Sequence, residues 1–302
     1  MKKPFILCAD LHIRDDQPKC RQDNFTKTLW KKFKYLKSVQ NDLNNCPILV
    51  AGDIFHHWRA RPYLINKCLK RLPKNMLCIA GNHDLPYHNI NQLKQSALET
   101  LVRAGRVKLI DGLFIHNQRS ALYHIHGFHY GIEPINVDRE NGITKIAVIH
   151  RLITEGVESP WRNSSSESAK SLIKSLKGYD LIVTGDNHNS FTVQIQQTLL
   201  VNPGSFTRQT AAQMEHKPCF YIWDSVTGEI EKVILPHDDK SVSNRHLKRE
   251  KERNQRMESF VQQLNDDYEI GLHFEKNLEI YFEANKEPKS VRNMVWKSVQ
   301  AI

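Results

Sequence analysis

The stretch Met76-Leu77-Cys78-Ile79-Ala80-Gly81-Asn82-His83-Asp84 decides the fold class of this protein. Its first five residues form an apolar run typical of a buried strand, and the run stops abruptly at Gly-Asn-His-Asp. In open α/β sheets, sites form at the carboxyl ends of the strands. The stretch therefore predicts a buried strand that carries polar, ligand-type side chains to the edge of a sheet.

Four further apolar runs end in the same way, each with a metal-ligand residue type at its tip. The runs and the residues that follow them are 5–9 with Asp10 and His12, 48–51 with Gly52 and Asp53, 146–149 with His150, and 181–184 with Gly185, Asp186 and His188. The two side chains of an Asp-x-His pair lie on the same side of an extended segment, because alternate residues share a face. We interpret the five strand ends as a two-metal site, in which Asp53 on its tight turn is the candidate for a bridging ligand. Mixed His, Asp and Asn ligands favour manganese, iron or zinc over magnesium.

Helices are expected between the strands of the first hundred residues. Apolar residues recur at helical spacing over 25–39, with lysines between them, and the same spacing recurs over 64–72 and 90–101. Short strands follow over residues 107–149. Alternation of strand and helix predicts an α/β fold built in layers.

The composition changes after Pro236. Residues 240–256 hold seven Lys and Arg against two Glu, which predicts an exposed basic helix, while 278–282 is expected to be a strand. We therefore divide the chain into a main domain, 1–235, and a small α+β appendage, 236–302.

The charge of the chain is unevenly distributed. The formal net charge is +10, and residues 1–74 hold sixteen Lys and Arg against six Asp and Glu, whereas the remainder holds twenty-seven of each. A basic field beside a metal site suits a polyanionic substrate, nucleic acid above all. A solvated basic face on the helix at 25–37 is the alternative that charge alone leaves open.

Six cysteines are present and no pair has CxxC spacing, which favours reduced thiols over disulfides or a zinc site. No apolar run approaches the length of a membrane span. We expect a protein of the cytoplasm, or of the host cytoplasm if a phage encodes it, with no membrane partner.

The set of motifs, D-x-H, G-D, G-N-H-D, H and G-x-x-H, resembles the calcineurin-like metallophosphoesterase superfamily over about residues 5–206. Gly52-Asp53-Ile54-Phe55-His56 with Arg61-Pro62, and the later turn Asn202-Pro203-Gly204-Ser205, are similar to SbcD-type nuclease subunits of DNA repair and recombination, including compact phage versions. The resemblance implies a four-layer α/β/β/α sandwich that binds two divalent ions, Mn²⁺ first, with Fe²⁺, Zn²⁺ or Mg²⁺ as alternatives. It assigns one ion to Asp10, His12, Asp53 and His188, and the other to Asp53, Asn82, His150 and Asp186.

The resemblance also implies roles for residues that do not bind metal. His83 orients the phosphate and protonates the leaving oxygen, and Asp84 is expected to hold the tautomer of His83. His56 resembles a family histidine that places the DNA end, with a loop histidine of no catalytic role as the alternative. His116, His124, His126 and His129 alternate on short strands, and we expect them to be structural.

Candidate phosphate contacts lie on loops next to the ligand strands. They are Arg14, Lys19, Arg59 and Arg61. Trp58 and Trp161 are candidates for stacking on a base, although anchoring of a loop or core is an equal alternative.

One motif departs from the family pattern, since Gly185-Asp186-Asn187-His188 stands where Gly-His-x-His is usual. Two ions are still expected, because a carboxylate can replace an imidazole as ligand. The resemblance implies a DNA nuclease, with 3′-to-5′ exonuclease action on duplex ends and endonuclease action on single strands, a homodimer and an SbcC-like ATPase partner. The alternatives are a protein phosphatase or cyclic-nucleotide phosphodiesterase of the same fold, and a catalytically impaired DNA-binding subunit.

Overall fold

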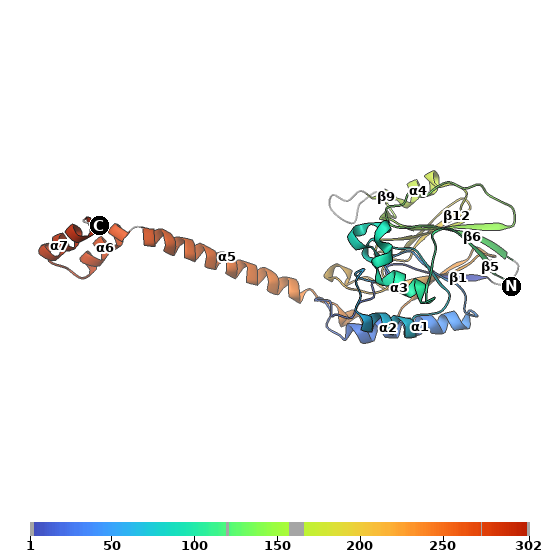
Figure 1. The fold of residues 1–302 in the computed structure, drawn as a ribbon, viewed down its shortest axis with the longest axis horizontal. Coiled ribbons are helices and arrows are strands. Elements are labelled where there is room, and N and C mark those ends of the chain that lie inside the picture. The colour runs from blue at the N-terminus through green and yellow to red at the C-terminus, as the bar shows by residue number, and fades with distance from the viewer. Residues whose placement is uncertain (1–2, 119–120, 157–165, 273, 301–302) are drawn as a thin grey trace. The chain divides into compact units, whose positions relative to one another are not determined.

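The computed structural model describes residues 3–118, 121–156, 166–272 and 274–300 (Figure 1). Two six-stranded sheets form its centre. The first sheet contains, in spatial order, β14 (Ile230–Ile234), β13 (Cys219–Asp224), β1 (Pro4–Cys8), β2 (Ile48–Val50), β3 (Met76–Cys78) and β4 (Lys108–Leu109). Strands β1 to β4 are parallel, so the ligand-bearing ends of β1, β2 and β3 meet at one edge.

The second sheet has a similar plan. It contains, in spatial order, β11 (Phe191–Ile195), β12 (Thr198–Asn202), β10 (Leu181–Gly185), β7 (Ile143–His150), β6 (Ala121–Phe128) and β5 (Gly112–Gln118). Its four central strands are parallel, with Gly185 of β10 paired to His150 of β7. The other two ligand-bearing ends are therefore neighbours as well. A short pair, β8 (Ile153–Thr154) and β9 (Glu167–Ser168), lies outside these sheets.

Helices cover the outer face of each sheet (Figure 1). They are α1 (Phe25–Asp42), α2 (Pro62–Arg71) and α3 (Ala97–Arg103) over the first sheet and α4 (Ala169–Ser175) over the second. Helix α1 follows the expected spacing, and Asn24 caps it by accepting a hydrogen bond from the Lys27 N–H at 2.8 Å. The pattern over 90–101 divides into a 3₁₀ segment and α3, because Ser96 accepts from the Glu99 N–H and starts a new helix there.

Three apolar layers hold the sandwich together. Along β1, Ile6 and Cys8 face the helices, whereas Phe5 and Leu7 face the second sheet, as the two-residue period of a strand requires. The third layer lies between the second sheet and α4, around Leu172. The expected four-layer α/β/β/α sandwich is thereby confirmed.

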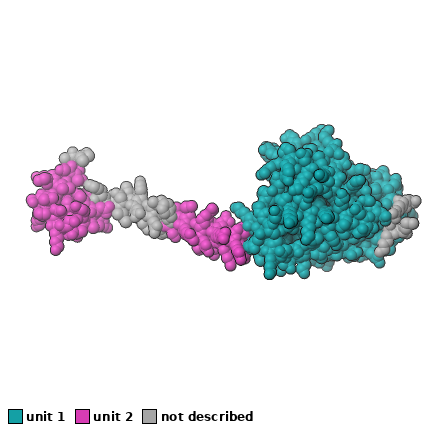
Figure 2. Space-filling view, turned by 90° about the horizontal axis from the view of Figure 1, so that it is seen from below, with its two compact units in different colours: residues 1–243 teal, residues 244–302 magenta. Residues whose placement is uncertain are grey.

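The chain divides into two compact units, residues 1–243 and 244–302, which Figure 2 distinguishes by colour. The first unit ends eight residues beyond the expected boundary at 235. The reason is a set of hydrogen bonds that tie 236–243 to the main domain: the Ser243 N–H donates to the Cys20 carbonyl at 2.9 Å, and Arg208 donates to Ser241 Oγ at 3.0 Å.

In the described residues, the second unit consists of three helices and their connections: α5 (Arg245–Leu272), α6 (Phe274–Ala284) and α7 (Lys289–Gln300). The strand expected at 278–282 was wrong, because this segment lies inside α6. Phe282 is buried there, packed edge-on against Trp296 at 6.5 Å, so its apolar character serves helix–helix packing. Nowhere in the described ranges does a helix combine the length and apolarity that crossing a bilayer requires.

Candidate metal centre

The five strand ends bring the predicted ligands to one place between the two sheets. Several of them sit in unusual backbone conformations, since Asp10, His12, Asp53 and Asp186 all have positive φ angles, from 42° to 74°. Non-glycine residues rarely adopt this left-handed region, and such strain gathers at functional sites. In a continuing strand, successive side chains would point to alternate faces. These turns instead direct the side chains toward the candidate metal centre.

One group of ligand atoms comes from Asp10, His12 and His188, which lie within 4.8 Å of one another. The Nε2 atoms of His12 and His188 are only 3.1 Å apart. Gln213 holds the ring of His188 from behind, with its Nε2 3.2 Å from His188 Nδ1. This group corresponds to the first of the two expected ion sites.

A second group comes from Asp10, Asp53 and His150, again within 4.8 Å. The Nδ1 of His150 lies 2.7 Å from the Ala51 carbonyl, so an N–H there donates to it and leaves Nε2 free as a ligand. The Oδ1 of Asn82 lies 3.0 Å from that Nε2. This group corresponds to the second expected site.

Asp53 occupies the bridging position between the two groups. Its Oδ2 lies 3.6 Å from His12 Nε2 and also 3.6 Å from His150 Nε2. Its Oδ1 accepts a hydrogen bond from the His83 N–H at 2.9 Å, which fixes the carboxylate. Gly81 is required beside it, because a Cβ at that position would lie 2.1 Å from Asp53 Oδ1.

Burial and neighbouring charges shift the pKa values of the ligand groups. Burial raises the pKa of Asp10 and of Asp53 above their ordinary values, and burial lowers that of His12 far below its own. Burial opposes protonation of His150 too, but the carboxylates of Asp53 and Asp10 raise its pKa to about 9. Metal ions bind ionised carboxylates and neutral imidazoles, so a bound cation would favour the charged forms of Asp10 and Asp53 and the neutral form of His150.

Two buried polar atoms in the centre support this interpretation. Asp10 Oδ2 and His12 Nδ1 are enclosed, and neither has a hydrogen-bond partner among the residues that the structure describes. Buried polar atoms are normally satisfied, so an orphaned carboxylate oxygen among imidazoles indicates a missing ligand. The residues present therefore fit divalent metal ions.

The family model for calcineurin-like phosphoesterases matches residues 3–190, which is more than half of the chain. This chain belongs to that family. Its members are metal-dependent phosphoester hydrolases, and the paired groups of ligands match that chemistry. A search of curated proteins returned no match.

Solved structures similar to this phosphoesterase share little sequence with it. An archaeal phosphodiesterase is 15% identical, with a TM-score of 0.40, over 77% of this chain and 99% of that one. A metallophosphoesterase from Sphaerobacter thermophilus is 11% identical, with a TM-score of 0.37, over 78% and 89%. The sulfate thiohydrolase SoxB of Thermus thermophilus, in complex with glycerol, is 10% identical, with a TM-score of 0.42, over 77% and 56%.

The role of Asp186 as a metal ligand stays a prediction. Its backbone N–H donates to Asp10 Oδ1 at 3.1 Å, and its carboxylate belongs to none of the described groups of converging ligand atoms. Its charge still acts on the centre, because it contributes to the raised pKa of His150. In this phosphoesterase, Asp186 positions Asp10 through its main chain.

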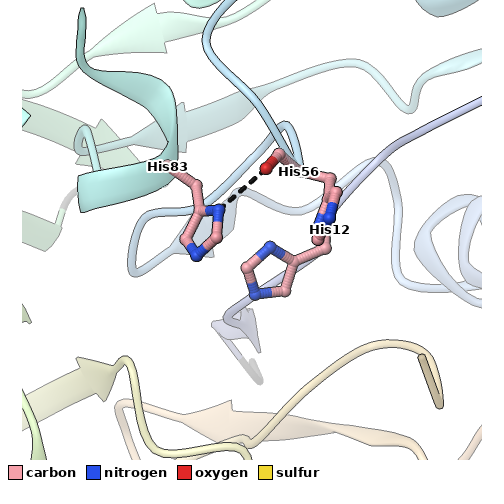
Figure 3. A group of neighbouring side chains, drawn as sticks. All are labelled: His12, His56 and His83. Carbon is pink, nitrogen blue, oxygen red and sulfur yellow. Dashed lines mark hydrogen bonds between the residues drawn. The ribbon is translucent and has the colours of Figure 1, made fainter. Parts of the chain in front are cut away.

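Three imidazoles gather beside the ligands, as Figure 3 shows. His12, His56 and His83 come from the loops after β1, β2 and β3, and His83 and His56 stack with ring centroids 5.5 Å apart. The Nδ1 of His83 lies 2.7 Å from the His56 carbonyl oxygen (Figure 3). The predicted pair His56 and His83 is thus brought together at the centre.

Asp84 was expected to hold the tautomer of His83, and this prediction was wrong. Asp84 is fully buried and accepts three backbone N–H groups, from Ile54, Phe55 and Gly81, at 2.9 to 3.1 Å. The His56 carbonyl, not Asp84, holds Nδ1 of His83. Asp84 instead fastens the turn after β2 to the turn after β3, and burial raises its pKa to about 7.

The four expected phosphate contacts differ in their surroundings. Arg14 lies nearest the centre, with Nη1 2.9 Å from His56 Nε2 and an ion pair to Asp16. The remaining three are exposed: Arg59 lies over the Trp58 ring at 4.6 Å, Arg61 is 3.6 Å from Asp15, and Lys19 lies on the loop before α1. Trp161 lies outside the described residues.

Sequence reasoning missed two glutamines that support the centre. Gln213 contacts His188, and the Gln209 Nε2 donates to the His12 carbonyl at 2.9 Å while its Oε1 accepts from Arg14 at 3.2 Å. Both follow the Asn202-Pro203-Gly204-Ser205 turn, which was the only signal near them. Of the spare histidines, His129 accepts the Ala80 N–H at 3.0 Å, a structural role as expected.

Proposed function

We propose that this phosphoesterase is a DNA nuclease that hydrolyses phosphodiester bonds with two divalent ions, Mn²⁺ first, in DNA repair, recombination or degradation. The observation that carries the proposal is the bridging position of Asp53, whose Oδ2 lies 3.6 Å from ligand nitrogens of both groups, within the segment that also supplies His56. The basic excess in residues 1–74 supports a polyanionic substrate. We place its action in the cytoplasm, of the host if a phage encodes it.

Asp10, His12, Asp53 and His188 would hold one ion, and Asp53, Asn82 and His150 the other. Ions bound there supply Lewis-acid activation of a water nucleophile and neutralise charge on the phosphoryl oxygens. The chain itself supplies the proton donor. Since Nδ1 of His83 is held by the His56 carbonyl, the protonated ring has its second N–H, on Nε2, available for the leaving oxygen.

His56 and Arg14 provide the substrate contacts in this proposal. The guanidinium of Arg14, fixed by Asp16, keeps His56 in place beside His83. Burial and the charge of Arg14 lower the pKa of His56 to about 4, so His56 is neutral at pH 7; its Nε2 accepts from Arg14, and its Nδ1 carries the ring proton. Arg14, Lys19, Arg59 and Arg61 would contact DNA phosphates.

The test is a hydrolysis assay across Mn²⁺, Mg²⁺, Fe²⁺ and Zn²⁺, with and without EDTA. Substrates are blunt duplex DNA, single-stranded DNA and bis-p-nitrophenyl phosphate. The proposal expects metal-dependent degradation of duplex ends with 3′-to-5′ polarity and cutting of single strands. Turnover of the small ester without any action on DNA would instead support a phosphatase or cyclic-nucleotide phosphodiesterase.

One observation favours a binding-only role. The Asp186 carboxylate lies outside the groups of ligand atoms, so the second site depends on fewer side chains. Metal counting by mass spectrometry under native conditions separates the two functions. Two bound ions with cleavage support the nuclease, and one ion with DNA binding but no cleavage supports the impaired subunit.

We propose the second unit as the partner-binding region, for an SbcC-like ATPase or a second copy of this chain. It leaves large apolar side chains exposed on its helices. They include Ile280, Tyr281, Val291 and Met294. Co-expression with the ATPase, followed by size-exclusion chromatography of the wild type and of Met294→Asp, tests the heteromeric complex, and sedimentation equilibrium tests the homodimer.

A further inference from the structure

The outer face of the first unit carries a basic groove between α1 and α2. It has a volume of about 750 Å³. Helix α1 contributes Lys27, Lys31, Lys34 and Lys37 to its lining. Their spacing of three or four residues places them along one side of the helix.

Helix α2 completes the groove with three more cations. Lys67, Lys70 and Arg71 line its other side. Trp30 lies between the two rows, with Lys67 Nζ 5.5 Å and Arg71 Cζ 5.8 Å from its ring centroid. Two cations of α2 are therefore held against the Trp30 ring of α1.

No carboxylate balances this charge. The residues that line the groove include no Asp or Glu, and within the described ranges none of the seven cations forms an ion pair. Uncompensated like charges that face one another repel, and an anionic occupant relieves the repulsion. The groove is thus suited to a polyanion.

Helices α1 and α2 begin on the side of the first sheet where the ligand-bearing strands end. Both helices follow loops from ligand-bearing strands, and these loops are joined where Arg14 Nη1 contacts His56 Nε2 at 2.9 Å. They are joined again where Arg61 lies 3.6 Å from Asp15. From there the helices run back along the outer face of the sheet, away from the centre.

We propose that this groove binds the phosphate backbone of duplex DNA beyond the bond that is cut. The inference rests on the proposed function and names a second contact surface for the same substrate. Ten residues separate Lys27 from Lys37, which is about 15 Å along a helix. Each strand of a duplex advances about 3.4 Å along the duplex axis per phosphate. A row of this length that lies parallel to the axis therefore spans roughly four phosphates of one strand.

The groove variant carries Lys31→Gln, Lys34→Gln and Lys70→Gln, three exposed lysines of the lining. The matched control carries Lys170→Gln, Lys174→Gln and Lys177→Gln, exposed lysines on or next to α4 with the same loss of charge. Both are made in the full chain. Turnover of bis-p-nitrophenyl phosphate with Mn²⁺ checks that the variants keep a working centre.

Binding of a short blunt duplex is measured by fluorescence anisotropy in EDTA over a series of salt concentrations. Three lost phosphate contacts should reduce the slope of log K against log salt by about 2.7, since each contact contributes about 0.9. The control variant should keep the wild-type slope. An equal reduction of the slope in both variants would overturn the proposal that the groove binds DNA, because it would show only a general effect of net charge.

Nuclease activity and DNA binding in the groove can be contradicted independently of each other. If the wild type cleaves duplex DNA and the groove variant keeps the full slope, the groove is wrong and the nuclease stands. If the groove lysines govern DNA binding but no metal supports cleavage, the groove stands and the nuclease is wrong. Binding to phosphatidylserine vesicles that depends on the groove lysines, with DNA binding independent of them, would overturn the proposal in favour of a membrane surface.

Discussion

At the scale of residues, a small number of hydrogen bonds fixes the geometry of the metal centre. Asp53 is held on one oxygen by the His83 N–H, and its other oxygen is equidistant from the two ligand imidazoles. His83 is held in turn by the His56 carbonyl. His83 therefore orients the bridging carboxylate through its main chain, and its ring is the proposed proton donor. Outer contacts of this kind fix ligand orientation.

Replacing His83 with alanine should greatly slow cleavage while leaving metal and DNA binding intact. General acid catalysis contributes about 10²- to 10⁴-fold, so the rate of duplex hydrolysis should fall by that factor. Metal content by mass spectrometry and DNA affinity by anisotropy should match the wild type. His57→Ala, an exposed histidine in the neighbouring loop, is the control. Full cleavage by the His83 variant would remove it from the mechanism.

Replacing Asp186 with histidine restores the usual family residue. We expect hydrolysis to be kept or increased, because an imidazole at this position can join the second group of ligands while the main-chain N–H still donates to Asp10. Calorimetric titration with Mn²⁺ should show tighter binding of the second ion. Complete loss of activity would show that the carboxylate is specifically required.

At the scale of elements, α1 combines a basic outer face with one buried cation. Lys32 is 1% exposed on the inner side, and its Nζ has no hydrogen-bond partner in the described structure. Burial, with the charges of Arg21 and Arg208, lowers the pKa of Lys32 to about 7. The charged form of the Lys32 amine therefore lowers the stability of the protein, since it is poorly solvated at this buried position.

This burial makes stability depend on pH. The pKa of Lys32 is lower in the folded state, so the unfolded chain binds more protons above pH 7 and the free energy of unfolding should rise from pH 7 to 8.5. Lys32→Met should flatten this rise and stabilise the protein at pH 7 by a few kcal/mol, at about 1.4 kcal/mol per pKa unit. Urea denaturation at the two pH values measures both effects, with Lys31→Met, on the exposed face, as control. A steep rise that persists in Lys32→Met would assign it to other groups.

At the scale of the whole molecule, the metal centre and its supports belong to one compact unit. Every predicted ligand and both supporting glutamines lie within residues 1–243, and the segment 236–243 is hydrogen-bonded to that unit. The three apolar layers that close the sandwich also belong to it.

Ending the chain after Ser243 should therefore leave the first unit folded. We expect its melting temperature, measured by calorimetry, to change by no more than about 2 °C, because neither core nor centre loses a side chain. Turnover of bis-p-nitrophenyl phosphate should be unchanged, whereas assembly with a partner should be lost. Ending the chain after Leu235 is the contrasting variant, and it should unfold more easily, because it removes the bonds from Ser241 and Ser243.

The sequence by itself determined the layered sandwich and nearly all of the candidate ligands that converge at the strand ends. Buried parallel strands read as continuous apolar runs, and the polar residue after each run lies where the strands end, so position along the chain was sufficient for Asp10, Asp53, Asn82 and His150. Only the tertiary structure decided the partner of His83, the main-chain role of Asp186 and the support from Gln209 and Gln213. Those depend on where loops of different strands meet, which no local pattern encodes. The same holds for the segment 278–282, because an apolar run of that length fits a strand and a packed helix equally well, and its packing against α7 selects the helix.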